Sequence, residues 1–303
     1  MKSQIDLRAI LILLVLCAGW GLNQVAIKIT LAGIPPLMQI GGRSLVAVLC
    51  LLVWCAVSGK RLFERDGSLP AGLLAGLLFS GEFLFMFFGV AHTTASRSVI
   101  FVYLSPFVVV LVGHFVLGER LSRVKLAGLV LAFLGVVLAF SDSLFGAVQG
   151  SLPGDLLCIG AAIAWGATTI VVKRSKLRDV GAEKALLYQL AVSATVALGL
   201  SLMLGETLNT SSVPAVLPWF LYQSVLVAGI SYLIWFTLIQ AYPAGLLSSF
   251  TFLTPLFGVI FGGWILGEPL TMRLVGALVL VAAGIYLVNR RRPLRARASG
   301  ASA

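Results

Sequence analysis

The sequence has few charged residues for its length. Asp, Glu, Lys and Arg make up only 11% of its 303 residues, whereas soluble domains carry about a quarter. Hydrophobic residues make up 59% of the chain, and the mean hydropathy is +1.05. A chain with so little polar surface cannot cover a water-soluble fold. The composition therefore excludes a soluble globular protein and predicts one embedded in a lipid bilayer.

Residues that carry chemistry are also scarce. The chain has two histidines, 11 acidic residues and four cysteines. Cys17, Cys50, Cys55 and Cys158 all lie in apolar runs, without the spacing of a metal site or a disulfide framework. An intramembrane enzyme would need clustered His, Asp, Glu or Ser, which the apolar runs do not offer. We expect no metal, no cofactor and no enzymatic activity.

Apolar runs fill most of the chain. A spanning helix needs roughly 20 apolar residues, and turn formers and charge clusters divide the sequence into ten such runs. We place them at residues 8–30, 35–57, 69–91, 94–117, 122–141, 153–173, 184–205, 216–240, 244–266 and 271–289. The pattern predicts an all-α integral membrane protein with ten transmembrane helices.

The net charge of +11 is distributed according to these spans. With the N-terminus in the cytoplasm, every Lys and Arg except Lys28, Arg43, Arg97 and Arg273 falls on the cytoplasmic side. This is the positive-inside pattern, and it predicts that both termini are cytoplasmic. The basic tail at 290–303 then serves as a topology anchor that can touch anionic lipid, and no nucleic-acid partner is expected. The first run is too long for a signal peptide and is expected to be a span.

One stretch of 21 residues occurs twice, at 101–121 and 250–270, with 9 identical positions. Each copy places a hydroxyl residue and a proline in mid-helix and ends in Leu-Gly-Glu. Upstream, Trp20-Gly21 aligns with Trp165-Gly166. The chain is therefore expected to be two five-helix repeats, 1–146 and 147–289, followed by the tail. Because five is odd, the second repeat would be inverted in the membrane, an architecture typical of secondary transporters with a central cavity.

These features resemble a known family. The ten-helix plan, the two Trp-Gly pairs and the mid-helix proline before Leu-Gly-Glu are similar to the drug/metabolite transporter superfamily, in its EamA-repeat branch, over about residues 8–289. The resemblance implies a bacterial inner-membrane exporter of small metabolites. An aromatic-rich interior, as in an aromatic amino acid exporter of that branch, suggests aromatic amino acids as cargo. Other neutral amino acids, nucleosides and drugs are alternatives, and a non-transporting membrane scaffold is a more distant one.

Two tryptophans are the first candidates for the cavity wall. At a helical period of about 3.6, Trp20 shares a face with Asn23 and Gln24, and Trp165 shares one with Thr168 and Thr169. Polar side chains on spanning helices rarely face lipid. Further aromatic residues at repeat-equivalent or neighbouring positions would stack against flat or apolar ligands: Phe83, Tyr103, Tyr232, Trp235 and Phe252. Helix packing is the alternative explanation for both groups.

Pro106 and Pro255 are predicted hinges. Each lacks an N–H group and crowds the preceding turn, and Gly113 and Gly262 follow about two turns later, where bending is easy. The hypothesis is that the helices swing as gates at these points; a static kink is the alternative. We also expect Gly118 and Gly267 to end their helices, and Glu119 and Glu268 to lie at the start of the next helix.

Glu82 and Arg43 are buried charges in the predicted third and second spans. An ionisable residue inside the membrane is a functional candidate and usually has a partner. Glu82 either pairs with Arg43 or Arg97, or meets a substrate ammonium group or carries a proton. The partners expected are therefore a small-molecule substrate, the bilayer and, in the second case, protons. The coupling ion and the oligomeric state stay open.

Overall fold

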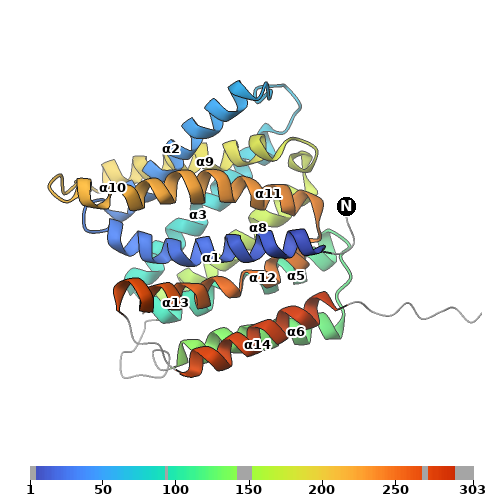
Figure 1. Cartoon of the computed structure of the whole chain (residues 1–303). Helices are drawn as coiled ribbons and strands as arrows, with labels where there is room; N and C mark the ends of the chain where they lie inside the picture. Colours follow the sequence, from blue (N-terminus) through green and yellow to red (C-terminus); the bar gives the residue numbers. More distant parts are fainter. Residues whose placement is uncertain (1–4, 93–94, 142–151, 268–271, 291–303) are drawn as a thin grey trace, which may run out of the picture.

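The computed structural model describes residues 5–92, 95–141, 152–267 and 272–290, and within these ranges the regular structure is helical throughout (Figure 1). The first half contains α1 (Leu7–Thr30), α2 (Pro36–Val57), α3 (Leu69–His92), α4 (Ala95–Val102), α5 (Ser105–Val116) and α6 (Arg123–Ala139). The second half contains α8 (Leu152–Arg174), α9 (Ala182–Met203), α10 (Val213–Leu221), α11 (Tyr232–Ala241), α12 (Ala244–Phe250), α13 (Leu253–Leu266) and α14 (Met272–Asn289). A 3-10 turn, Lys176–Arg178, follows α8, and a π-helical segment, Tyr222–Ser231, joins α10 to α11.

The helices are those of a multi-pass membrane protein, as predicted. Eight stretches of the described chain are long and apolar enough to cross a bilayer. They match predicted spans to within a few residues. The helices α6, with 17 residues, and α14 are shorter, so the predicted count of ten spans stays a prediction for these two.

The predicted fourth and ninth spans are each interrupted in the middle. The helix α4 ends at Val102 and α5 begins at Ser105, while α12 ends at Phe250 and α13 begins at Leu253. At both interruptions the backbone closes a tighter turn, with Leu104 N donating to Phe101 O at 3.1 Å and Thr254 N donating to Thr251 O at 2.9 Å. Pro106 lies in the first turn of α5 and Pro255 in the first turn of α13, where a missing N–H costs no hydrogen bond.

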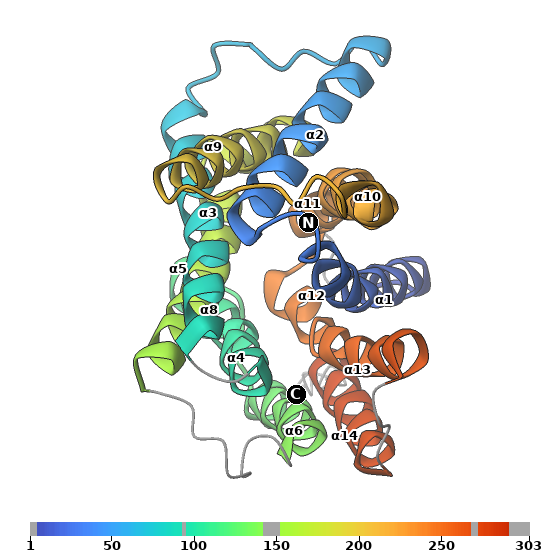
Figure 2. The ribbon, with the colours of Figure 1, turned by 90° about the vertical axis from the view of Figure 1, so that its left-hand side faces the viewer.

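Helices of the two halves pack against each other rather than separately (Figure 2). The main pairs across the halves are α1 with α13, α5 with α8, α3 with α8 and α9, α2 with α9, and α6 with α14. Glycines permit two of these contacts. A Cβ atom at Gly21 would lie 2.5 Å from Phe257 Cβ, and one at Gly166 would lie 2.5 Å from Val108 Cγ1. Because no side chain fits at such distances, the glycine of each Trp-Gly pair is required for close helix packing.

The molecule places apolar side chains outside and many polar ones inside. Val15, Phe115 and Trp264 are 72%, 81% and 80% exposed, as expected for side chains that face lipid. Arg43, Gln189 and Gln223 are buried among the helices. The four cysteines are free. The buried polar side chains are therefore the candidates for a functional site.

Candidate functional site

A cavity of about 510 Å³ lies among the helices of both halves. Its wall includes Trp20 in the middle of α1 and continues to Lys28 and Leu31 at the C-terminal end of that helix, and to Pro36 at the start of α2. The cavity therefore extends from the middle of the molecule to the end that carries the α1–α2 connection, the end that faces the viewer in Figure 2. Its volume suits a small-molecule ligand.

The structure brings the predicted wall residues together, with Phe252 the exception. Residues from α1, α3, α8, α11 and the turn between α4 and α5 meet at this cavity, although they lie far apart in the sequence. They are Trp20, Asn23, Gln24, Glu82, Phe83, Tyr103, Trp165, Thr168, Thr169, Tyr232 and Trp235. Their contact with a substrate stays a prediction, but their convergence on one cavity is a feature of the fold.

The aromatic part of the wall is held by edge-to-face contacts. The ring of Trp20 lies 5.3 Å from that of Trp235 and 6.2 Å from that of Tyr232, and the ring of Tyr103 lies 5.8 Å from that of Trp165. Trp20 also donates from Nε1 to Ser231 Oγ at 2.8 Å. Because a buried indole N–H needs an acceptor, this bond lets the ring lie in an apolar site. The two halves thus contribute rings to a common, preorganised surface.

Phe252 does not line the cavity. It is fully buried, with its ring 6.3 Å from Phe107 and 6.4 Å from Phe133. The prediction extended one helical face through positions 245–256, but the helix is interrupted between Phe250 and Leu253. The interruption changes the direction of the side chains, so that Thr254 lines the cavity instead. Its repeat equivalent Tyr103 does lie at the wall.

Arg43 and Glu82 lie in the wall of the same cavity. Arg43 is only 3% exposed, and its guanidinium carbon is 4.3 Å from the centre of the Phe83 ring. Among the described residues, these two side chains do not form an ion pair in direct contact. The expected close pair is thus absent, and both groups face the interior of the cavity. The side chain of Arg97, the other partner considered, lies outside the described residues.

Several buried polar atoms at this wall have no hydrogen-bond partner within the described part of the chain. They are Asn23 Oδ1, Arg43 Nε, Gln223 Oε1 and Thr254 Oγ1. Buried polar atoms are normally paired, so these four unpaired atoms are unusual features of the residues that form this wall. Sequence reasoning missed Gln223, because this residue lies in the π-helical segment, where the ordinary helical period does not hold.

The opposite end of the cavity helices is closed by contacts between the halves. Glu119 accepts from the backbone N–H groups of Ala244 at 2.8 Å and Gly245 at 3.2 Å, the first residues of α12. Lys173 Nζ lies 3.7 Å from the same carboxylate and donates to the backbone oxygen of Tyr242. Tyr242 donates from its hydroxyl to Asp6 at 2.9 Å. We call Asp6, Glu119, Lys173, Tyr242 and Ala244 the closed-end network.

The prediction that Glu119 lies at the start of the next helix in the sequence is therefore wrong. Glu119 does cap a helix, but the helix is α12 of the other half rather than α6, which begins at Arg123 behind its own cap, Ser122. The glycine part of the Leu-Gly-Glu prediction is confirmed, because Gly118 and Gly267 adopt φ of +66° and +70° after their helices. Glu268 lies outside the described residues.

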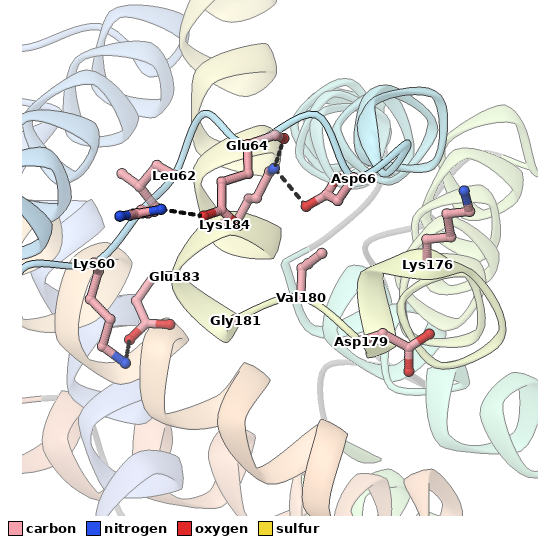
Figure 3. A pocket seen from close by; sticks show the side chains of 11 residues that line it. Lys60, Leu62, Glu64, Asp66, Lys176, Asp179, Val180, Gly181, Glu183 and Lys184 are labelled. Atoms are coloured by element: carbon pink, nitrogen blue, oxygen red, sulfur yellow. Dashed lines mark hydrogen bonds and ion pairs between the residues drawn. The ribbon is translucent and has the colours of Figure 1, made fainter.

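A second cavity, of about 530 Å³, lies between the α2–α3 connection and the start of α9 (Figure 3). Its charges are largely paired with one another. Lys184 contacts Asp66 Oδ2 and Glu64 O, both at 2.7 Å, and Lys60 contacts Glu183 at 3.2 Å. The Lys184 ammonium group, which donates to Asp66, holds the pKa of that carboxyl below its usual range. These contacts tie the two halves together at their surface, so we assign them a structural role.

Comparison with known proteins identifies the family. The model of the EamA-like transporter family matches residues 7–141 and residues 152–290, one copy in each half. A probable amino-acid metabolite efflux pump of Salmonella typhimurium is 31% identical over 286 residues, which cover 88% of this chain and 90% of the relative. The uncharacterized transporter YvbV of Bacillus subtilis is 29% identical over 296 residues, covering 96% and 94%.

One crystal structure shares the fold. It covers 91% of this chain and 94% of its own with a TM-score of 0.81, at 18% sequence identity. The family pattern occurs once in each half, and both halves contribute helices to the central cavity. The chain is a multi-pass membrane protein and belongs to the EamA-like transporter family.

Proposed function

We propose that the protein exports small amphipathic metabolites, foremost aromatic amino acids, by alternating access of the central cavity to the two sides of the membrane. The observation that carries this proposal is the wall itself, in which aromatic rings from both halves line the same cavity as residues with unpaired buried polar atoms. Flat apolar groups stack on such rings. The relatives of Salmonella typhimurium and Escherichia coli are named probable amino-acid metabolite efflux pumps, which favours amino acids as the substrate class.

The charge distribution supports an outward-facing state. The basic connections after α2, α5 and α8 lie at the same end as the closed-end network, and the cavity extends to the other end. By the positive-inside rule we propose that the basic end is cytoplasmic, with both termini on the cytoplasmic side of a bacterial inner membrane. The cavity then faces outward. The reciprocal pairs α1–α13 and α8–α5 support two inverted halves, because each joins the first helix of one repeat to the interrupted helix of the other.

The interrupted helices support the gate hypothesis. The breaks before Pro106 and Pro255 leave two short helices in place of one at each position, and short segments turn more easily than a continuous rod. A Cβ atom added at Gly113 would have no neighbouring atom closer than 3.8 Å, so α5 has room there. The carbonyl of Gly262, which is buried, accepts from the N–H of Gly267 at the end of α13. We propose the two prolines, Gly113 and Gly262 as hinge positions.

Flux into proteoliposomes tests the function. Purified protein is reconstituted, and uptake of labelled tryptophan and phenylalanine is measured against protein-free vesicles, with other neutral amino acids, nucleosides and cationic drugs as competitors. We expect saturable flux that is stimulated by counter-substrate and inhibited best by aromatic amino acids. A pH gradient across the vesicle shows whether protons are coupled.

Two variants make the test specific to the cavity. Trp20→Ala and Trp165→Ala remove wall rings from each half and should reduce flux at least about tenfold, because each loses stacking area and a fixed ring. Trp264→Ala removes an indole that is 80% exposed on the outer surface and serves as the matched control. Flux no greater than that of protein-free vesicles for every aromatic amino acid contradicts the proposal, and nucleosides or drugs as sole substrates support the alternative cargo.

A further inference from the structure

We infer that Arg43 binds the carboxylate of the substrate, opposite Glu82 as the partner of its ammonium group, so that the cavity selects zwitterionic amino acids by both charges. This inference rests on the proposed function for its substrate class. It assigns Arg43 as a specificity-determining residue, rather than as the structural counter-charge of Glu82. Three features of the cavity carry it.

The first feature is the surroundings of Arg43. Its guanidinium lies on the face of Phe83 at 4.3 Å from the ring centre, and its Nε has no hydrogen-bond partner within the described residues although Arg43 is 3% exposed. A charged group inside the membrane is unfavourable unless its donors are paired. Stacking on the ring stabilises the charge and fixes the plane of the group, but it leaves the Nε donor without a partner among the described residues. Arg43 is therefore held in position with hydrogen bonds still to make.

The second feature is the chemistry that fits those donors. A guanidinium presents its N–H groups as a planar fork, and a carboxylate accepts two of them in parallel. An amide, hydroxyl or ring nitrogen offers only one acceptor in that plane and carries no charge. Among small amphipathic metabolites, the group that best satisfies Arg43 is thus a carboxylate.

The third feature is the opposite charge in the same wall. Glu82 directly precedes Phe83 in α3, so that the ring on which Arg43 stacks is attached next to the acidic residue. Within the part of the chain that the structure describes, the two charges are not in direct contact, so that one solute in the cavity can bind both. An α-amino acid carries a carboxylate and an ammonium group on one carbon and so satisfies both at once. Its side chain then meets the rings of Trp20, Trp165 and Trp235.

Equilibrium binding to the purified full-length protein at pH 6 tests the inference. Three probes share one ring: L-phenylalanine has both charges, L-phenylalaninamide lacks the carboxylate, and 3-phenylpropionate lacks the ammonium group. L-leucine and L-leucinamide form a second pair without an aromatic ring. We expect each loss of a charged group to raise Kd at least about tenfold, because a charge-assisted hydrogen bond is lost.

The variants assign each effect to a residue. In Arg43→Gln, phenylalanine and its amide should bind with similar Kd, within about threefold, because the group that distinguishes them is gone. Arg43→Lys keeps the charge without the fork and should retain part of the discrimination. Glu82→Gln should still discriminate against the amide but not against 3-phenylpropionate. Arg61→Gln, the same change on a loop side chain that is 84% exposed, is the matched control and should behave as the wild type.

The outcomes separate this inference from the proposed function. If phenylalanine and its amide bind the wild type equally, or if Arg43→Gln keeps the wild-type ratio, Arg43 does not read the carboxylate, even where aromatic transport is observed. If only the leucine pair binds and its discrimination depends on Arg43, the inference stands and the aromatic preference fails. If none of the amino acids binds, both are overturned. Binding of the amide by Arg43→Gln at its wild-type Kd shows that the variant is folded.

Discussion

Lys28 and Lys173 occupy equivalent positions in the two repeats, but their surroundings differ. Lys173 has a side chain that is only 4% exposed, bonded to Tyr242 and close to Glu119. Lys28 is exposed and lines the central cavity. One end of the molecule is therefore closed by direct bonds between the halves, and at the other end the equivalent lysine borders open space. The same sequence element thus supports either a closed or an open end, as alternating access requires.

Glu119→Ala is expected to have the largest effect on the difference between the closed end at Lys173 and the open end at Lys28. The substitution removes the cap of α12 and the acidic neighbour of a buried lysine, which together cost roughly 3 kcal/mol of stability. The closed end should loosen and the unfolding temperature should fall. Cys17, which is 0% exposed and bonds to Phe250 O, should become alkylated at least about tenfold faster in a variant that lacks the other three cysteines.

Glu64→Ala provides the control for that experiment. Glu64 is 59% exposed in its side chain and lies 3.6 Å from Arg61, so the same change removes only a surface pair. Its unfolding temperature and its Cys17 alkylation should match those of the parent. Equal alkylation of Cys17 in the Glu119 and Glu64 variants would show that the closed-end network does not keep this end shut.

A smaller effect is expected from the prolines. Pro106→Ala and Pro255→Ala each restore a backbone N–H and favour a continuous helix across the interruption. Flux should fall by about 3- to 10-fold, while the unfolding temperature stays the same or rises, since helix propensity improves. Proteoliposome flux and thermal unfolding of the same preparations measure the two effects. Unchanged flux together with unchanged alkylation of Cys17 would identify both breaks as static.

The smallest effect concerns the loops at the closed end. The pKa of Asp66 is lowered mainly by its hydrogen bond from Lys184. A lowered pKa in the folded state adds stability above the ordinary Asp pKa of about 3.9, and this stability is lost as the pH falls through the lowered value. Asp66→Asn should thus lower the unfolding temperature slightly at pH 6, and the difference from wild type should shrink below about pH 4. A difference that does not change over this range would show that Asp66 does not act through its charge.

Local sequence pattern was sufficient to predict many of the residues that line the cavity. Trp20 and Trp165, with the polar residues one turn on, lie in regular helices, and there the helical period correctly predicted the face that lines the cavity. The cap glycines Gly118 and Gly267 were equally predictable, because left-handed backbone after a helix strongly favours glycine. These features depend on neighbours in the sequence alone.

The features that were missed depend on irregular backbone or on distant contacts. Phe252 lies at a helix interruption, where the extrapolated helical period assigned it to the wrong face, and Gln223, which was not predicted, lies in a π-helical segment. Glu119 binds α12 across 125 residues of sequence. Such a contact leaves no local pattern, so only the assembled fold shows which helix Glu119 caps.

The close contacts of Gly21 and Gly166 mean that the repeats are units of sequence and not of folding. Each glycine lies against a helix of the other repeat, Gly21 against α13 and Gly166 against α5. Neither repeat alone can therefore complete the packing surface of its own first helix. Each repeat therefore forms part of the interior of the other.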